Sequence, residues 1–96
     1  MALSNFTPSG YAMMAALWGT SSVQALPGGG GATLVVTNMG PSPAVVLLGG
    51  STATVTPATG MVILAHSTVA LAVGSNGYIA AIGTESNATL NLAQGA

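Results

Sequence analysis

The sequence of 96 residues contains no cysteine, no lysine and no arginine, and the side chains that ionise near neutral pH are one glutamate, Glu85, and one histidine, His66. Without cysteine the fold has no disulfide and no thiolate for catalysis or metal binding. Nucleic acids and anionic lipid head groups are bound largely through basic side chains, which this chain lacks. We therefore expect neither a nucleic acid nor a membrane as a partner.

The scarcity of ionisable groups also argues against a catalytic or metal site. A single glutamate cannot supply the two carboxylates that glycosidases use, and a hydrolase triad would need His66, Glu85 and a serine to converge. No serine lies in a G-x-S-x-G motif, and one His with one Glu cannot complete a coordination sphere within one chain. Glycines 28–31 are followed by Ala-Thr-Leu and not by the Lys and Ser/Thr of a phosphate-binding loop. We predict that the protein is not an enzyme and has no catalytic residue, no metal site and no cofactor.

Short apolar runs separated by turn residues dominate the chain after residue 20. The stretch from Thr33 to Leu48 has two such runs around Asn-Met-Gly-Pro-Ser-Pro, which predicts a β-hairpin. Asn76-Gly77 predicts a second hairpin, with a type I′ turn between residues 68–73 and 78–82. We expect further strands at residues 21–26, 51–56, 61–65 and 87–92. The apolar run 61–65 is either a strand buried on both faces or a segment that closes one end of the core.

Seven or eight strands of five or six residues, spaced by short turns, are typical of sandwiches and barrels. The fold class that we predict is all-β, a small two-sheet antiparallel β-sandwich with jelly-roll-like topology and an N-terminal arm. A chain of this length supports one core. We divide it into residues 1–20, an arm or a short first element, and residues 21–96, the sandwich domain.

Residues 1–20 differ from the rest because they hold the only Trp, the only Phe, one of two Tyr and three of five Met. A helix would place Tyr11, Met14 and Trp18 on one face, whereas a strand would place Tyr11, Met13 and Leu17 on one side. The spacing does not decide between them. The segment is either a first element that closes the core or an arm that orders against a neighbouring subunit. Because aromatic residues and Met are enriched at protein interfaces, we predict partner contacts at Phe6, Tyr11, Met13, Met14 and Trp18.

A chain that is half apolar and nearly uncharged is prone to associate. Exposed sheet edges are usually protected by Lys, by inward-pointing charges or by Pro, and only Pro is available here. We infer that some sheet edges and one apolar face are covered by copies of the chain or by a larger partner.

Over about residues 21–93, the progression VVTNMGPSPAVVLLGG, STATVTPATGMVILAHSTVALAVGSNGYIAAI and NATLNL resembles small all-β virion proteins of tailed bacteriophages that decorate or cement the capsid. The resemblance lies in a strand followed by T-N-x-G, an apolar strand ending at Gly, a Thr-rich strand and a final Y-I-A-A-I strand. It implies a homotrimer on the outer surface of the virion that bridges copies of the major capsid protein. The complete lack of basic residues departs from that pattern.

Two other classes stay open at this stage. A carbohydrate- or surface-binding sandwich would stack sugars on Trp18, Tyr11 or Tyr78, the available aromatic platforms. A self-assembling tail-fibre or surface-layer subunit would polymerise through its neutral strands.

Overall fold

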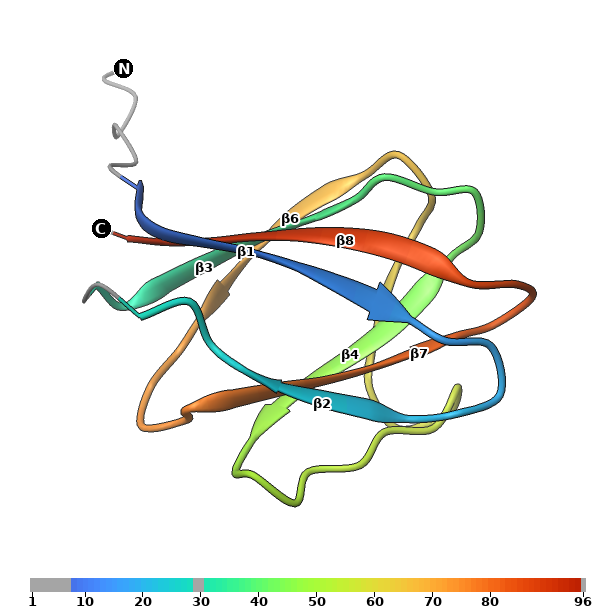
Figure 1. Ribbon diagram of the computed structural model, residues 1–96, viewed down its shortest axis with the longest axis horizontal. Coiled ribbons are helices and arrows are strands. Elements are labelled where there is room, and N and C mark those ends of the chain that lie inside the picture. Colours follow the sequence, from blue (N-terminus) through green and yellow to red (C-terminus); the bar gives the residue numbers. More distant parts are fainter. Residues whose placement is uncertain (1–7, 29–30, 96) are drawn as a thin grey trace.

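The computed structural model describes residues 8–28 and 31–95, and these form eight β-strands and no helix. The strands are β1 (Pro8–Ala16), β2 (Ser22–Ala25), β3 (Thr33–Asn38), β4 (Ala44–Gly49), β5 (Met61–Ile63), β6 (Thr68–Ala72), β7 (Tyr78–Gly83) and β8 (Ala88–Gly95). Sheet A has the strand order β1-β8-β3-β6, and sheet B has the order β2-β7-β4-β5 (Figure 1). The predicted all-β, two-sheet antiparallel sandwich is confirmed.

The strand pairing is that of a long hairpin wound around a core. β1 pairs with β8, β2 with β7, β3 with β6 and β4 with β5, so the first four strands pair in order with the last four in reverse. Winding this hairpin brings β3 against β8 and β4 against β7, which completes each sheet. This winding of eight strands into two sheets is the jelly roll.

Alternating side chains place the core between the sheets. In β3 the residues that point inward are buried, and the same alternation runs along β8. The largest fully buried apolar side chains of this core are Leu34, Val36, Leu90 and Leu92 from sheet A and Val46, Ile63 and Ile79 from sheet B. Each contributes about 1.5–3 kcal/mol through burial, so the sandwich is stable without disulfides.

Neither predicted hairpin forms, because each pair of neighbouring segments is split between the two sheets. β3 pairs with β6 and β8, whereas β4 pairs with β5 and β7, and the chain crosses between the sheets through residues 39–43. β6 and β7 are separated in the same way, and the positive φ in their connection lies at Gly74, not at Asn76 or Gly77. The predicted type I′ turn is therefore wrong. Turn residues mark where the chain reverses, but they do not specify whether it re-enters the same sheet.

The side-chain amide of Asn38 holds the crossing between β3 and β4. Its Nδ2 donates hydrogen bonds to the carbonyl oxygens of Ser42, at 2.9 Å, and Ile63, at 3.0 Å. Its Oδ1 accepts a hydrogen bond from the backbone N–H of Gly40, at 2.8 Å. Asn38 is fully buried, and every buried polar side-chain atom in the described residues has a partner. One amide thus satisfies three backbone groups at the point where the chain changes sheet.

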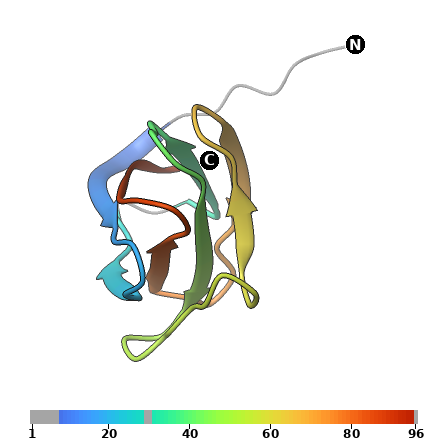
Figure 2. The ribbon, with the colours of Figure 1, turned by 90° about the vertical axis from the view of Figure 1, so that its right-hand side faces the viewer.

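The threonine-rich segment that we predicted as a strand at residues 51–56 is a loop instead. Its turns extend beyond the sheets in Figure 2, where the loop is yellow-green. Val55 is buried against Val45, Ala80 and Ile82, on the face of sheet B that points away from the main core. The Val55 N–H donates a hydrogen bond to Ser21 Oγ at 3.0 Å. The loop therefore forms a small second core, which is why two successive positions in β4 are buried on opposite faces.

The apolar run 61–65 also departs from its prediction, because only Met61–Ile63 is a strand and it lies at the edge of sheet B. Met61 and Val62 are about half exposed, so the run is not buried on both faces. The described part of the chain holds no helix of the length and apolarity that a bilayer crossing requires.

Candidate interaction surface

The first described element is a strand, which decides between the two periodicities of the N-terminal sequence. β1 forms the edge of sheet A and pairs with β8 along its length. Tyr11 and Met13 point outward, with 68% and 51% of their surfaces exposed. The strand-like alternation is the one that the fold adopts, and residues 8–16 are a first element of the sandwich. Of residues 1–20, which we predicted as an arm or a short first element, residues 1–7 lie outside the described residues.

One of the five predicted contact residues, Met14, is placed differently from Tyr11 and Met13. Met14 points into the core and is 4% exposed, packed with buried side chains of both sheets. Since neighbouring strand residues face opposite ways, Met14 cannot share a surface with Met13. It is a core residue and leaves the contact set. Phe6 lies outside the described residues.

Two central rows of outward side chains run across the four strands of sheet A. The register aligns Tyr11 with Ala93, Val35 and Ala70 in one row, and Met13 with Asn91, Thr37 and Thr68 in the next. We call this surface the neutral face, defined by Tyr11, Met13, Val35, Thr37, Thr68, Ala70, Asn91 and Ala93. None of these side chains carries a charge at neutral pH, and most are small.

Four side chains of the neutral face form hydrogen bonds with one another. Thr37 Oγ1 and Thr68 Oγ1 share a hydrogen bond of 3.0 Å, and Asn91 Nδ2 lies 3.3 Å from Met13 Sδ, to which it donates. A surface without charge, and with several polar groups already paired, costs little to remove from water. Another protein can therefore cover the neutral face without leaving an ion buried.

Trp18 lies beyond the neutral face, where the chain leaves β1 and crosses to sheet B. Its backbone N–H donates to Asn87 Oδ1 at 2.8 Å, and Trp18 forms a bridge with Gly83. The backbone N–H of Gly83 also donates a hydrogen bond to the carbonyl oxygen of Leu17, at 2.8 Å. The backbone is thus fixed while 63% of the Trp18 surface is exposed. The structure brings Tyr11 and Met13 together and places Trp18 at one end of the sandwich.

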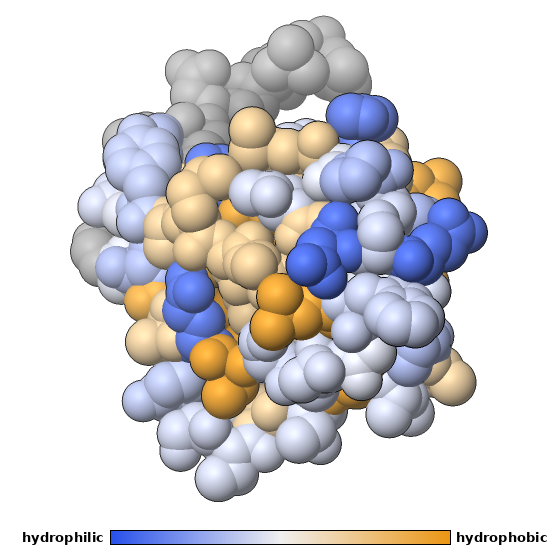
Figure 3. All heavy atoms as spheres, turned by 45° about the vertical axis from the view of Figure 1, so that its right-hand side comes forward, coloured by the Kyte–Doolittle hydropathy of each residue, from blue (hydrophilic) through white to orange (hydrophobic). Residues whose placement is uncertain are grey.

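The ionisable residues His66 and Glu85 are exposed and lie in turns outside the neutral face. His66 has a φ of 62°, and its ring packs over Gly40, where an added Cβ would lie 2.8 Å from a ring carbon. Residues 8–28 and 31–95 contain no group of three His, Cys, Asp or Glu side chains that could hold a metal ion. On the side of the molecule seen in Figure 3, the few strongly hydrophilic residues are separated by pale and orange ones.

A second candidate surface, which is apolar and was not predicted from the sequence, lies between the free edges of the two sheets. It is a groove of about 540 Å³ lined by Val46, Leu47, Leu48, Gly60, Met61, Leu71 and Ala72. β5 and β6, in yellow and gold, follow this side of the sandwich in Figure 2. The only sequence signal was the apolar run 61–65, whose short strand leaves the groove open.

Comparison of the chain with known proteins finds no matching family model, no similar curated protein and no solved structure that matches it.

Proposed function

We propose that the protein is a structural component of a bacteriophage virion that binds the outside of the capsid and stabilises it by bridging neighbouring copies of the major capsid protein. The observation that carries this proposal is the neutral face, an exposed and charge-free sheet surface on which Tyr11 and Met13 stand side by side on one strand. Aromatic side chains and Met are enriched where proteins contact one another, whereas charged residues are depleted in the centres of interfaces.

Bridging a shell does not require strong binding by each copy. A homotrimer attaches at several points, so contacts that are weak singly become strong together. Shape and apolar burial are enough for such contacts, which fits a chain with one acidic residue and no basic residue. The jelly roll also occurs in viral capsid proteins, and this likeness is an analogy of fold only.

A carbohydrate-binding module receives less support from the geometry. Tyr11 lies on the neutral face, Trp18 lies at one end of the sandwich, and Tyr78 begins β7, where it pairs with Ala25 and Gly49. These aromatic side chains come from separate surfaces, so they do not form one stacking platform.

The test is co-sedimentation of the protein with capsid shells assembled from the major capsid protein of the genome that encodes it. Tyr11→Glu and Met13→Glu each place a charge on the neutral face, and Val23→Glu is the matched control because Val23 is an exposed strand residue on the outer face of sheet B. We expect the two neutral-face variants to bind about tenfold more weakly or worse, since burying an unpaired charge costs more than 1.4 kcal/mol. The control should bind like the original protein.

Unchanged shell binding by both neutral-face variants would refute the proposal, as would a failure of the original protein to bind shells. Point variants are needed because deletion of residues 1–20 would remove β1 and with it an edge strand of sheet A. Circular dichroism of each variant verifies that the sandwich is intact.

A further inference from the structure

One strand edge of sheet B is only half covered. β5 pairs with Ala44, Val45 and Val46, which are the first three residues of β4. Among the described residues, 47–49 of β4 have a partner in β7 on one side and no partner strand on the other. Such an edge leaves backbone N–H and C=O groups ready to pair with another strand. The chain has no lysine or arginine with which to block it.

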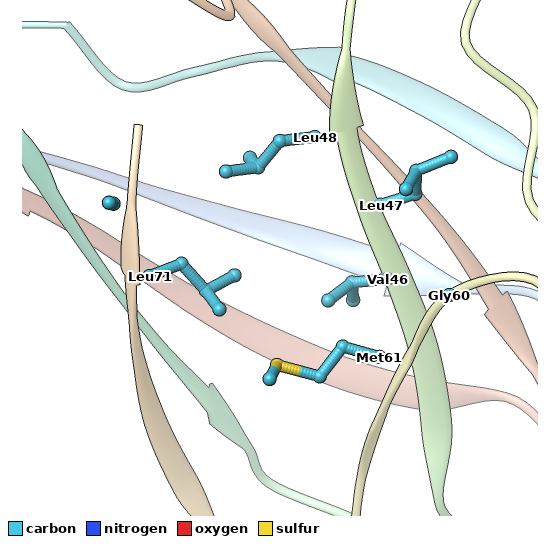
Figure 4. A pocket seen from close by; sticks show the side chains of 7 residues that line it. Val46, Leu47, Leu48, Gly60, Met61 and Leu71 are labelled. Carbon is cyan, nitrogen blue, oxygen red and sulfur yellow. The ribbon is translucent and has the colours of Figure 1, made fainter. Parts of the chain in front are cut away.

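The groove lies directly beside this open edge. In Figure 4, Leu71 of β6 points toward β4, while Val46, Leu48 and Met61 point toward β6. Val46 belongs to the main core, and Leu48 and Leu71 pack against it, so the groove leads toward the space between the sheets. An extended chain paired with the open edge could therefore insert alternate side chains among apolar ones.

The opposite side of the sandwich is joined across its edges. There the Gln24 Nε2 of β2 donates a hydrogen bond to the Met13 carbonyl of β1, at 3.2 Å. Gly28 N–H likewise donates to Gln94 Oε1 at 3.1 Å, which ties the connection after β2 to β8. Hydrogen bonds thus join the sheets on the side of β1 and β2, whereas the side of β5 and β6 has an open strand edge beside an apolar groove.

We propose that this groove binds residues 1–7 of a second copy of the chain, which pair with β4 as an added strand. Addition of a strand to an exposed edge obtains affinity from backbone hydrogen bonds and specificity from pockets for alternate side chains. The segment Met-Ala-Leu-Ser-Asn-Phe-Thr carries no side-chain charge, and as a strand it would present Met1 and Leu3 on the same side. Those two side chains match the apolar lining of the groove.

The length of the segment favours a second copy over the same chain. Pro8, Gly95, Thr33 and Ala72 share one row of sheet A, so Pro8 lies three strand spacings, or about 14 Å, from Ala72 in the groove lining. Reaching the edge of sheet B takes about another 10 Å, the usual separation of packed sheets. Seven residues span about 23 Å when extended. Since these two displacements are perpendicular, the straight-line distance is about 17 Å, which takes about five of the seven residues. About two residues would remain to pair within their own molecule, whereas all seven are available to a neighbour.

Such a contact is heterologous, because the segment of one copy meets the groove of the next. Heterologous contacts close into rings when the rotation between copies allows it, and a ring of three is the homotrimer of the proposed function. The inference rests on that proposal for the number of copies. It names the contact between them, whereas the neutral face is the contact with the shell.

The natural absence of cysteine makes disulfide trapping a clean test. Leu3→Cys and Met61→Cys are introduced in separate full-length chains, which are mixed and oxidised gently, and the products are identified by mass. The control partner is Met39→Cys, because Met39 is 53% exposed against 49% for Met61 and lies past the opposite end of sheet A from Ala72. We expect Leu3→Cys to cross-link to Met61→Cys several-fold more than to Met39→Cys, since a disulfide requires close Cα atoms.

A variant with both Leu3→Cys and Met61→Cys in one chain separates exchange between copies from pairing within one. We expect disulfide-linked dimers and trimers from it. Monomers with an internal disulfide, or equal cross-linking to Met61→Cys and Met39→Cys, would overturn the inference. Shell binding is measured independently with the neutral-face variants, so failure here is distinguishable from failure of the proposed function.

Discussion

Replacing Asn38 with Ala tests whether one buried amide holds the change of sheet between β3 and β4. The substitution removes three hydrogen bonds and leaves two backbone carbonyls and one backbone N–H without their partner in a buried site. At about 1 kcal/mol for each bond, we expect unfolding free energy to fall by about 3 kcal/mol. A domain of this size has about 5–15 kcal/mol in total, so the loss is a large fraction of its stability.

The assay is urea unfolding followed by far-ultraviolet circular dichroism, which reports on the strands. Asn91→Ala is the matched control, because Asn91 is a partly exposed residue of the neutral face whose amide donates to the Met13 thioether. We expect the control to stay within about 0.5 kcal/mol of the original protein. Asn38→Asp keeps the side-chain shape but cannot donate to the two carbonyls, so it should lose at least as much as Asn38→Ala. If Asn38→Ala costs no more than Asn91→Ala, the assigned role of the amide is refuted.

Two further substitutions test the loop on sheet B and the packing near Trp18. Val55→Ala removes apolar groups from the small second core and should cost about 2 kcal/mol in urea unfolding, whereas Thr54→Ala, at an exposed position, should be nearly neutral. A Cβ at Gly83 would collide with the carbonyl oxygens of Ser86 and Ala16, so Gly83→Ala should lower stability by about 1–3 kcal/mol. Gly50→Ala meets nothing within 4 Å and should leave the thermal midpoint unchanged or slightly raised. Equal midpoints for the two glycine variants would contradict this packing.

The sequence predicts the strands better than their partners, for a physical reason. Alternation in residues 33–38 reports which side chains turn inward, because it depends only on the pleat of one strand. Pairing depends on contacts far apart in the chain, such as those of β3 with β8, and turn residues do not encode it. The threonine alternation in residues 51–56 also fits a strand, but hydrogen bonds of Thr56 with Thr59 form a local turn instead.

The same limit applies to the candidate surfaces: the sequence shows which residue types are present, but not which of them the fold brings to one surface. Tyr11 and Met13 could be identified as contact candidates from residue type, but the sequence allowed two periodicities, and Met14 became a core residue once the strand was known. The groove could not be predicted, because it exists only where β5 is shorter than β4 and β6 closes the other side. No local pattern records the relative lengths of two strands that meet across a loop.

The mass of the full-length chain in solution is the most direct measure of whether its uncharged edges are covered by partner copies. Sedimentation equilibrium over a wide range of concentration should give three times the 9.2 kDa of one chain. A constant mass of 9.2 kDa, even in concentrated solution, would show that the open edge of β4 and the groove beside it need no partner.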